Sequence, residues 1–419
     1  MNDAKVAHRI REKVTEFSGK VSAGLPKTAG RLVREVVYGM QSRGSVRLSE
    51  IARSLEEPTR MKKVIERLGR QLNRAELREK VRVNLLRLAA KRIDQESLLV
   101  VDPTDISKPY ASKMQYLARV RDGSDGGIRD GYWCCQVVAT RRASREVLPL
   151  YQELYSQKAP DFDSENEEIL KAIEKVSSET GGEGTWVVDR GGDRKEIIVP
   201  LLRWKCRFLI RLRGDRHLVV RRGAKRVEEI AAQCRLPYRE TVIKESQDDE
   251  QVYHLDFGAC LVRFPGFDRP LFLVVVRGFG EKPLLLLTTM PIKKSRKSVW
   301  RVVESYLARW RVEETIRFIK QSYQLEDIRL LTYQRLQNMA SLVMTTAYFA
   351  CVYLEKSIKL KILVQHIHRA AKRIYGIPEF RYYALANGIK QILYSRTGAL
   401  SKPLLHLKDD KARLLPLTL

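Results

Sequence analysis

The chain has 419 residues, of which 44% are hydrophobic and 31% are charged. This length exceeds one ordinary domain, and the composition excludes both a miniprotein and an intrinsically disordered chain. Lys and Arg outnumber Asp and Glu by 78 to 50, which leaves a net charge of +28 at pH 7. Because such an excess repels itself in a compact fold, it favours a polyanionic partner, and nucleic acid is the commonest polyanion in a cell.

Cysteine usage and apolar segments indicate a protein of the reducing cytoplasm. The six cysteines lack the spacing of metal ligands, so we expect reduced thiols. The first residues are charged and lack the apolar stretch of a signal peptide. The longest apolar run, residues 336–354, contains polar residues such as Thr345 and Thr346 and suits a buried helix better than a membrane span. We therefore expect a cytoplasmic, nucleoid-associated protein with no membrane partner.

The N-terminal part is predicted to be entirely helical. Within it, a short helix at 48–55, a turn at 57–59 and a second helix from residue 60 resemble a helix-turn-helix. An ordinary helical bundle with a solvated basic face explains the same pattern equally well. In the first interpretation, the second helix presents four basic residues to DNA: Arg60, Lys62, Lys63 and Arg67.

A change of pattern after Asp94 marks the start of a mixed α/β unit. An apolar run at 98–101 predicts a buried strand that ends at Asp102. Two β-rich segments separated by a polar turn predict a hairpin, and helices then alternate with short strands. The expected elements are strands at 132–140 and 147–155, a helix at 165–178, a strand at 186–188, a helix at 195–204 and a strand at 207–212. Three antiparallel strands followed by this alternation predict a mixed α/β core.

Beyond the core, β-type runs replace helical signals over about residues 214–294, which we interpret as a β-rich insertion. Helical patterns return from 297 to 323 and continue through most of the remaining chain.

Two aspartates follow apolar strands of the predicted core. Asp102 comes after the run 98–101, and Asp189 comes after the strand 186–188. Functional groups in α/β sheets usually lie at the carboxyl ends of strands, although a turn residue is the more ordinary interpretation of either aspartate alone. Because adjacent carboxylates repel, a shared site is favourable chiefly with a cation between them, and oxygen ligands suit Mg²⁺ or Mn²⁺.

The predicted helix 297–323 carries four functional side chains on one face. At 100° per residue, their spacing places them within an arc of roughly 60°. A glutamate there can add a third carboxylate to a metal site, while basic side chains and a tyrosine hydroxyl can bind phosphates. An exposed helix with weak Glu–Arg pairs is the alternative. The four residues are Tyr306, Arg309, Glu313 and Lys320.

This spacing matches, without a gap, the Tyr-Arg-Glu-Lys signature of DDE transposases in the insertion-sequence-four-like family of bacterial elements. The segments 101–105 and 187–193 resemble the first and second aspartate motifs of that family. The order of two aspartates, a β-rich insertion and a glutamate helix is also similar to its ribonuclease H-like catalytic domain. The resemblance covers about residues 98–320.

The resemblance implies a role for each of these residues. Asp102, Asp189 and Glu313 would be catalytic and would hold two Mg²⁺ or Mn²⁺ ions. The DNA backbone near the cleaved end would contact the three other signature residues, Tyr306, Arg309 and Lys320. Asp105 lies three residues after Asp102 and is an alternative first ligand, but we favour Asp102 because it directly follows the apolar run. Asp193 is interpreted as a helix N-cap or as a group that supports the site.

The expected fold is α/β: a ribonuclease H-like catalytic core with a β-rich insertion, preceded by a helical N-terminal DNA-binding region and followed by C-terminal helices. The expected function is a DNA transposase that cleaves transposon ends and joins them to target DNA, with double-stranded DNA as partner and a homodimer in the complex. A ribonuclease H-like nuclease without strand transfer, or an inactive DNA-binding regulator, is the alternative. The expected boundaries are 1–95 for the DNA-binding region, 96–213 for the first part of the core, 214–295 for the insertion, 296–330 for the catalytic helix and 331–419 for the C-terminal region.

Overall fold

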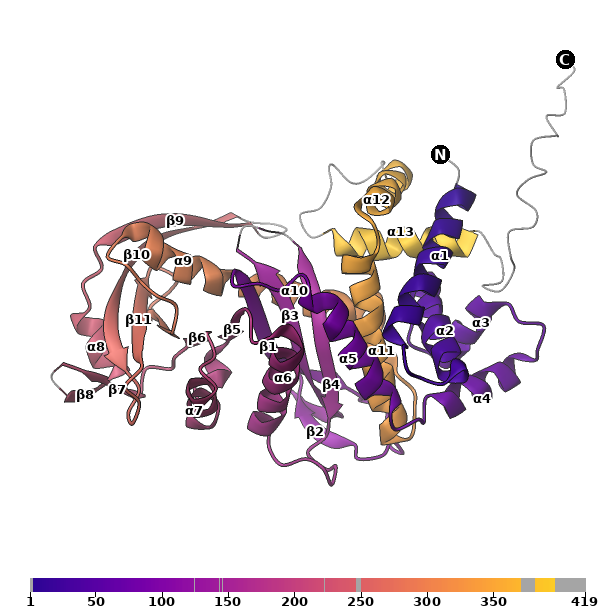
Figure 1. Ribbon diagram of the computed structural model, residues 1–419, viewed down its shortest axis with the longest axis horizontal. Coiled ribbons are helices and arrows are strands. Elements are labelled where there is room, and N and C mark those ends of the chain that lie inside the picture. Colours follow the sequence, from indigo (N-terminus) through magenta and orange to yellow (C-terminus); the bar gives the residue numbers. More distant parts are fainter. Residues whose placement is uncertain are drawn as a thin grey trace, which may run out of the picture.

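The computed structural model describes residues 3–123, 125–142, 144, 146–221, 223–245, 250–370 and 381–395. Parts of the expected C-terminal region, 371–380 and 396–419, therefore lie outside the described residues. Figure 1 shows an elongated molecule with N-terminal helices at one end, a β-rich lobe at the other and a mixed sheet between them.

Five helices form the N-terminal part, as the sequence predicted. Their boundaries follow local signals: α2 starts after Pro26 and ends at Gly44, whose positive φ of 62° lets its N–H bond to the carbonyl of Met40. The helices are α1 (Asp3–Val21), α2 (Lys27–Arg43), α3 (Leu48–Leu55), α4 (Met61–Gln71) and α5 (Leu77–Ala90).

The central sheet has strand order β4-β3-β1-β5-β6, in which β1, β3 and β4 are antiparallel and β5 and β6 run parallel to β1. This order, with its crossover helices, is that of a ribonuclease H-like core. The short strand β2 (Ala118–Arg121) pairs with β3 outside this set. The elements are β1 (Ser97–Ser107), β3 (Ile128–Arg141), β4 (Val147–Tyr155), α6 (Glu165–Thr180), β5 (Thr185–Val188), the short helix η1 (Arg190–Gly192), α7 (Lys195–Arg203) and β6 (Phe208–Arg211).

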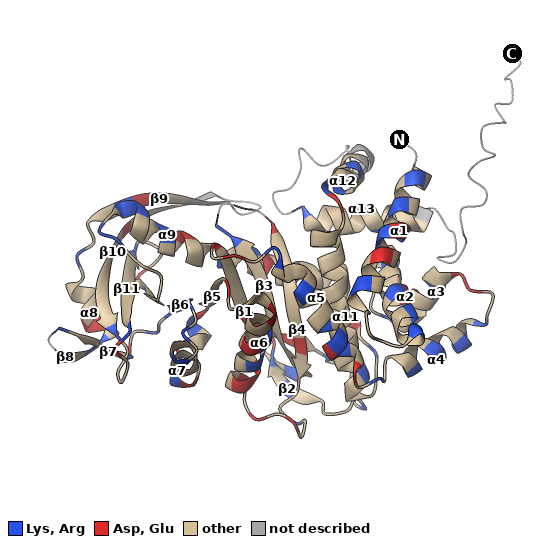
Figure 2. Ribbon diagram, viewed as in Figure 1, with Lys and Arg blue, Asp and Glu red and all other residues tan. Residues whose placement is uncertain are grey.

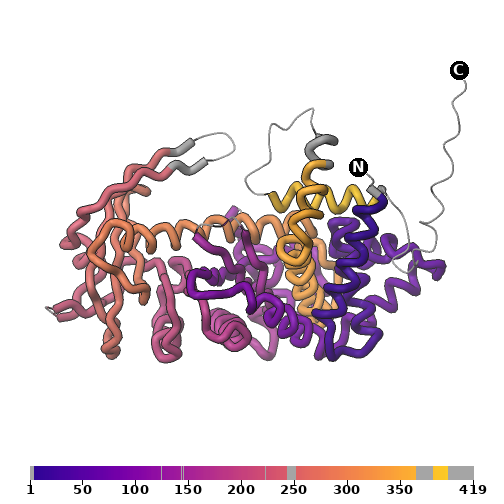
Figure 3. The backbone as a smooth tube through the Cα atoms, turned by 45° about the horizontal axis from the view of Figure 1, so that its top comes forward, coloured from indigo at the N-terminus to yellow at the C-terminus, as the bar shows by residue number. Residues whose placement is uncertain are grey.

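The β-rich segment extends this sheet instead of forming a separate one. Its last strand, β12, pairs antiparallel with β6, so the sheet continues through β11 and β10 to β7 and β8. Figure 3 shows β9 and β10 as a long hairpin that projects from the lobe. The elements are β7 (His217–Val220), β8 (Gly223–Arg226), α8 (Val227–Gln233), β9 (Tyr238–Glu245), β10 (Glu250–Arg263), β11 (Pro270–Arg277) and β12 (Leu284–Thr288).

The chain then returns across the sheet as helices. Both α6 and α10 pack against core strands, and Figures 1 and 3 place them on opposite faces of the sheet. The nearly completely buried α11 packs against β4, α5 and α2. These elements are α9 (Arg296–Leu307), α10 (Arg309–Ser322), η2 (Leu325–Asp327), α11 (Tyr333–Tyr348), the π-helical turn η3 (Phe349–Tyr353), α12 (Lys356–Ala370) and α13 (Tyr382–Ser395).

Buried polar contacts join the N-terminal helices to the core. Arg82 of α5 forms an ion pair with Glu153 of β4, and its side chain is only 3% exposed. Asn338 of α11 donates hydrogen bonds to the carbonyls of Leu72 and Arg74, beyond the end of α4. The buried α11 accounts for most of the apolar run 336–354, and within the described residues no helix has the length and apolar character needed to cross a bilayer.

Candidate active site

The parallel strands β1 and β5 bring the two predicted aspartates together. Val100 is in register with Val187, so Asp102 lies two residues further along β1 and Asp189 lies directly after the end of β5. Adjacent strands lie about 5 Å apart, which places the two aspartates next to each other. The sequence predicted that the strand ends at Asp102, and this prediction was wrong. Instead β1 continues to Ser107, because its antiparallel partner β3 continues beside it after β5 has ended.

The predicted helix 297–323 is divided at Ala308 into α9 and α10. Ala308 keeps right-handed backbone angles (φ −60°, ψ −18°), and its N–H bonds to the carbonyl of Glu304 at 3.0 Å. Its ψ is close to that of a 3₁₀ turn, so the helix tightens at this point without reversing direction. Tyr306 therefore lies in the last turn of α9, whereas Arg309 opens α10.

Electrostatic interactions link Asp102 to four of the other five predicted residues. The pKa of Asp102 is raised to about 7, mainly by burial and also by the neighbouring carboxylates of Asp189 and Glu313, while Arg309 and Lys320 oppose this shift. All four neighbours are therefore close enough to interact with Asp102. The cluster favours added positive charge, because its two cations do not offset the cost of ionising Asp102.

Arg309 connects the remaining predicted residue to this cluster. Its guanidinium forms an ion pair with Glu313 at 2.6 Å and lies 5.7 Å from the centre of the Tyr306 ring. The Tyr306 hydroxyl and the Arg309 Nε are both buried, and neither has a hydrogen-bond partner among the described residues. Buried donors without acceptors are costly, so these two atoms favour an incoming acceptor such as a phosphate oxygen.

Lys320 is held by carboxylates that the sequence analysis did not connect to it. Its Nζ lies 3.5 Å from Asp105 and 3.6 Å from Glu326. Asp105 is buried and also accepts hydrogen bonds from the Gly123 N–H and the Ser107 hydroxyl. Because 215 residues separate Asp105 from Lys320, no local spacing could have indicated this pair.

Asp193 has a different role from the predicted N-cap. The helix α7 begins at Lys195 after Arg194, and Asp193 instead follows η1. Its carboxylate accepts a hydrogen bond from the backbone N–H of Arg213 and pairs with Arg216. The N-cap prediction was therefore wrong. Asp193 thus joins the loop after β5 to the loop after β6. The basic residues at 213 and 216 were the sequence signal that could have indicated this role.

The carboxylate set suits a divalent metal in its chemistry. Asp102, Asp189 and Glu313 supply only oxygen donors, as Mg²⁺ and Mn²⁺ prefer. Among the described residues, no three His, Cys, Asp or Glu side chains are arranged to hold one metal ion. The Glu313 carboxylate is instead paired with Arg309.

The basic face of α4 is only partly available. Arg60, Lys62 and Lys63 are exposed, and Figure 2 shows basic residues along this helix at the end of the molecule. Arg67 instead forms ion pairs with Glu35 at 2.6 Å and Glu57 at 2.7 Å. The expectation that Arg67 reaches DNA is therefore not supported, because its charge is already used to join helices within the N-terminal part.

The strand order and the site define a ribonuclease H-like domain with carboxylates on two strands and on the following helix. Residues 93–349 match the family described as Transposase DDE domain, and the chain belongs to this family. No curated protein matches the sequence. Among solved structures, the chain is similar to the piggyBac transposase in a cryo-EM synaptic complex with hairpin DNA. The identity is 11%, the match covers 99% of this chain and 85% of that one, and the TM-score is 0.44.

Proposed function

We propose that the protein is an active DNA transposase of the Tyr-Arg-Glu-Lys subgroup, similar to the insertion-sequence-four-like family. The observation that carries this proposal is the clustering of the signature residues of α9 and α10 with Asp102 and Asp189. A structural helix face would not need a partner-free tyrosine hydroxyl and a guanidinium beside three carboxylates. The proposed reaction is cleavage at transposon ends followed by joining of the freed ends to target DNA.

In the proposed site, Asp102, Asp189 and Glu313 hold two Mg²⁺ or Mn²⁺ ions. Such ions, when bound, activate a water or a DNA 3′-hydroxyl and stabilise the charge on the leaving oxygen. Arg309 and the Tyr306 hydroxyl lie beside these carboxylates and offer buried donors to a phosphate. With a bound ion as its partner, Glu313 would no longer need Arg309, whose guanidinium would then be free to bind a phosphate.

Lys320 completes the proposed DNA contact from the other end of α10. In the DNA-free protein it is held by Asp105 and Glu326 at 3.5 and 3.6 Å, at the outer range of an ion pair. The Glu326 side chain is 48% exposed, so a phosphate can replace this contact at low cost. Lys320 therefore contributes a charge that is already positioned near the metal site.

The proposed partner is double-stranded DNA, supported by the net charge of +28. We assign residues 1–95 to binding of the transposon ends, with Arg60 at the N-cap of α4 and Lys62 and Lys63 in its first turn as exposed cations. The assignments of 96–213 and 296–330 to the catalytic core, 214–295 to the insertion and 331–419 to the C-terminal region belong to the same proposal. A homodimer is proposed in the complex, because two ends must be brought together.

The test is an assay of the purified protein on a labelled duplex that carries the ends of its own element, with Mg²⁺, Mn²⁺ or EDTA. Metal-dependent cleavage at the ends, followed by joining to a second duplex, supports the transposase. Cleavage without joining would support a ribonuclease H-like nuclease. Specific binding without cleavage in either metal would support a regulator and overturn the proposal.

A further inference from the structure

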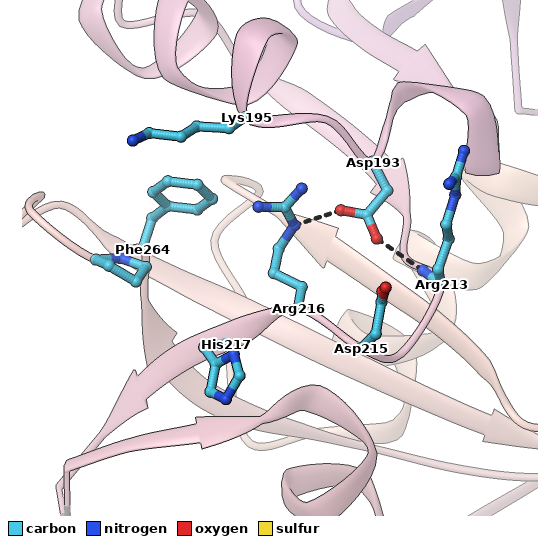
Figure 4. Close-up of a pocket in the computed structure, with 8 residues that line it drawn as sticks. Asp193, Lys195, Arg213, Asp215, Arg216, His217 and Phe264 are labelled. Atoms are coloured by element: carbon cyan, nitrogen blue, oxygen red, sulfur yellow. Dashed lines mark hydrogen bonds and ion pairs between the residues drawn. The ribbon is translucent and has the colours of Figure 1, made fainter.

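A cavity of about 420 Å³ lies between the loop after β5 and the start of β7, and its lining includes Asp193, four residues after Asp189. Figure 4 shows its lining, in which Lys195 of α7 and Arg216 of the loop after β6 lie near the ring of Phe264, while Arg213 lies on the far side of Asp193. The lining residues on which the argument depends are Asp193, Lys195, Arg213, Asp215, Arg216 and Phe264.

Arg216 is held in one orientation by the surrounding protein. Its Nε donates to the carboxylate of Asp193, whose side chain is only 1% exposed, and its guanidinium lies 5.5 Å from the centre of the Phe264 ring. The Asp193 carboxylate also accepts the Arg213 N–H at 2.8 Å. With Nε fixed and the plane held by the ring, the two terminal nitrogens of Arg216 form a preorganised fork, the geometry that binds phosphate oxygens in pairs.

Two further cations of the lining are available to a ligand. Lys195 is exposed and has no ion-pair or hydrogen-bond partner among the described residues. Arg213 uses its Nε on the carbonyl of Arg190 at 3.4 Å, and its terminal nitrogens have no described partner. Asp193 is already occupied by Arg216, so Asp215 is the one acidic group that opposes an anion in the described lining. The cavity therefore presents excess positive charge around an oriented guanidinium.

We propose that this cavity binds a backbone phosphate of DNA a short distance from the phosphate that is cleaved. This inference rests on the proposed function, which supplies DNA as the ligand. Asp193 follows Asp189 by four residues, a stretch that spans at most about 14 Å. The bound phosphate is therefore expected on the DNA backbone near the phosphate that is cleaved.

The test measures DNA binding of the full chain by fluorescence anisotropy, in EDTA and over a range of KCl concentrations, with a labelled duplex of the element's end. For the double variant Lys195→Gln with Arg213→Gln, we expect Kd to rise about tenfold and the salt dependence to fall by about 0.9 in log–log slope per lost phosphate. The matched control is Arg203→Gln, which removes an exposed charge from the other end of α7 and should leave the slope unchanged.

Two single variants test the geometry and the sign of the charge effect. Arg216→Lys keeps the charge beside Asp193 but loses the fork, so DNA binding should weaken while the thermal midpoint stays close to that of the wild type. Asp215→Asn removes the opposing charge and should tighten binding. An unchanged or weaker affinity for Asp215→Asn would contradict an anion in this cavity.

Two results would overturn the proposal. The first is a double variant with the same affinity and slope as Arg203→Gln. The second combines two observations: inorganic phosphate stabilises the wild type against heat but not the double variant, and the salt dependence of DNA binding is the same in both. The cavity would then bind a free anion and not the DNA backbone. Failure of the proposed function is separable, since it appears as wild-type protein that binds DNA with a normal salt slope but does not cleave it in Mg²⁺.

Discussion

Replacing Glu313 by glutamine separates catalysis from folding and from DNA binding. The Glu313 side chain is 42% exposed and pairs at 2.6 Å with Arg309, which is 11% exposed. The substitution keeps the size and one acceptor oxygen, and partly exposed ion pairs contribute about 0.2 to 1 kcal/mol, so the free energy of unfolding should fall by less than about 1 kcal/mol. Release of Arg309 from its partner leaves DNA binding unchanged or at most about fivefold tighter.

Catalysis should respond far more strongly to the same change. A neutral amide is a poor ligand for Mg²⁺, and loss of metal stabilisation removes several kcal/mol from the transition state. At 1.36 kcal/mol per tenfold, single-turnover cleavage of an end duplex should slow by about a thousandfold or more.

The matched control for Glu313→Gln is Glu314→Gln. Glu314 is the next residue on the same helix, and it pairs with Arg317 at 2.8 Å on a partly exposed surface. This variant should cleave like the wild type. Cleavage by Glu313→Gln within tenfold of the wild type would refute its role as a ligand. Joint loss of folding and binding would show that Glu313 is structural.

Three more predictions concern other buried groups. Tyr306→Phe removes a buried hydroxyl without a described partner, so urea unfolding should show equal or greater stability while end binding weakens; reduced stability with unchanged binding would contradict the assigned role. Glu153→Gln removes one of the two carboxylates that pair with the buried Arg82, the other being Glu79, and should lower the free energy of unfolding by about 1 to 3 kcal/mol, whereas a loss below about 0.5 kcal/mol would show that the pair is dispensable. Burial lowers the pKa of Lys108 from 10.5 to about 8. As the pH falls from 10.5 to 8, Lys108 therefore takes up a proton in the unfolded chain before it does so in the folded protein, and the free energy of unfolding decreases. Lys108→Met has no side chain that takes up this proton. As the pH falls from 10.5 to 8, its free energy of unfolding, measured in urea titrations, should therefore rise by about 3 kcal/mol relative to that of the wild type. A difference in free energy that does not change with pH would argue against the shifted pKa.

Local patterns were sufficient to predict the order of the main elements. Alternation and apolar runs predicted the strands that became β1, β3, β4, β5 and β6 and the β-rich segment that follows them. The spacing of the four signature residues predicted that they share one helix face, because helical periodicity depends only on neighbours within a few turns. The break at Ala308 was missed, since it follows from backbone angles at a residue with high helix propensity.

The juxtaposition of Asp102 with Asp189 depended on strand pairing, which the sequence indicated only through the order of the strands. The ion-pair partners of the charged residues were harder still to predict from the sequence. Lys320 with Asp105, Arg82 with Glu153 and Arg216 with Asp193 are separated by 215, 71 and 23 residues, and each carboxylate had several possible cations in a chain with 78 Lys and Arg residues.

The sequence by itself therefore determined the groups of the proposed site: three carboxylates, a tyrosine and two cations at fixed spacings. Only the tertiary structure decided which charges neutralise each other and which remain available to a ligand. The physical reason is range, because helix and strand periodicities arise from contacts between near neighbours, whereas ion pairing depends on distances of a few ångströms set by how β1, β5 and α10 pack.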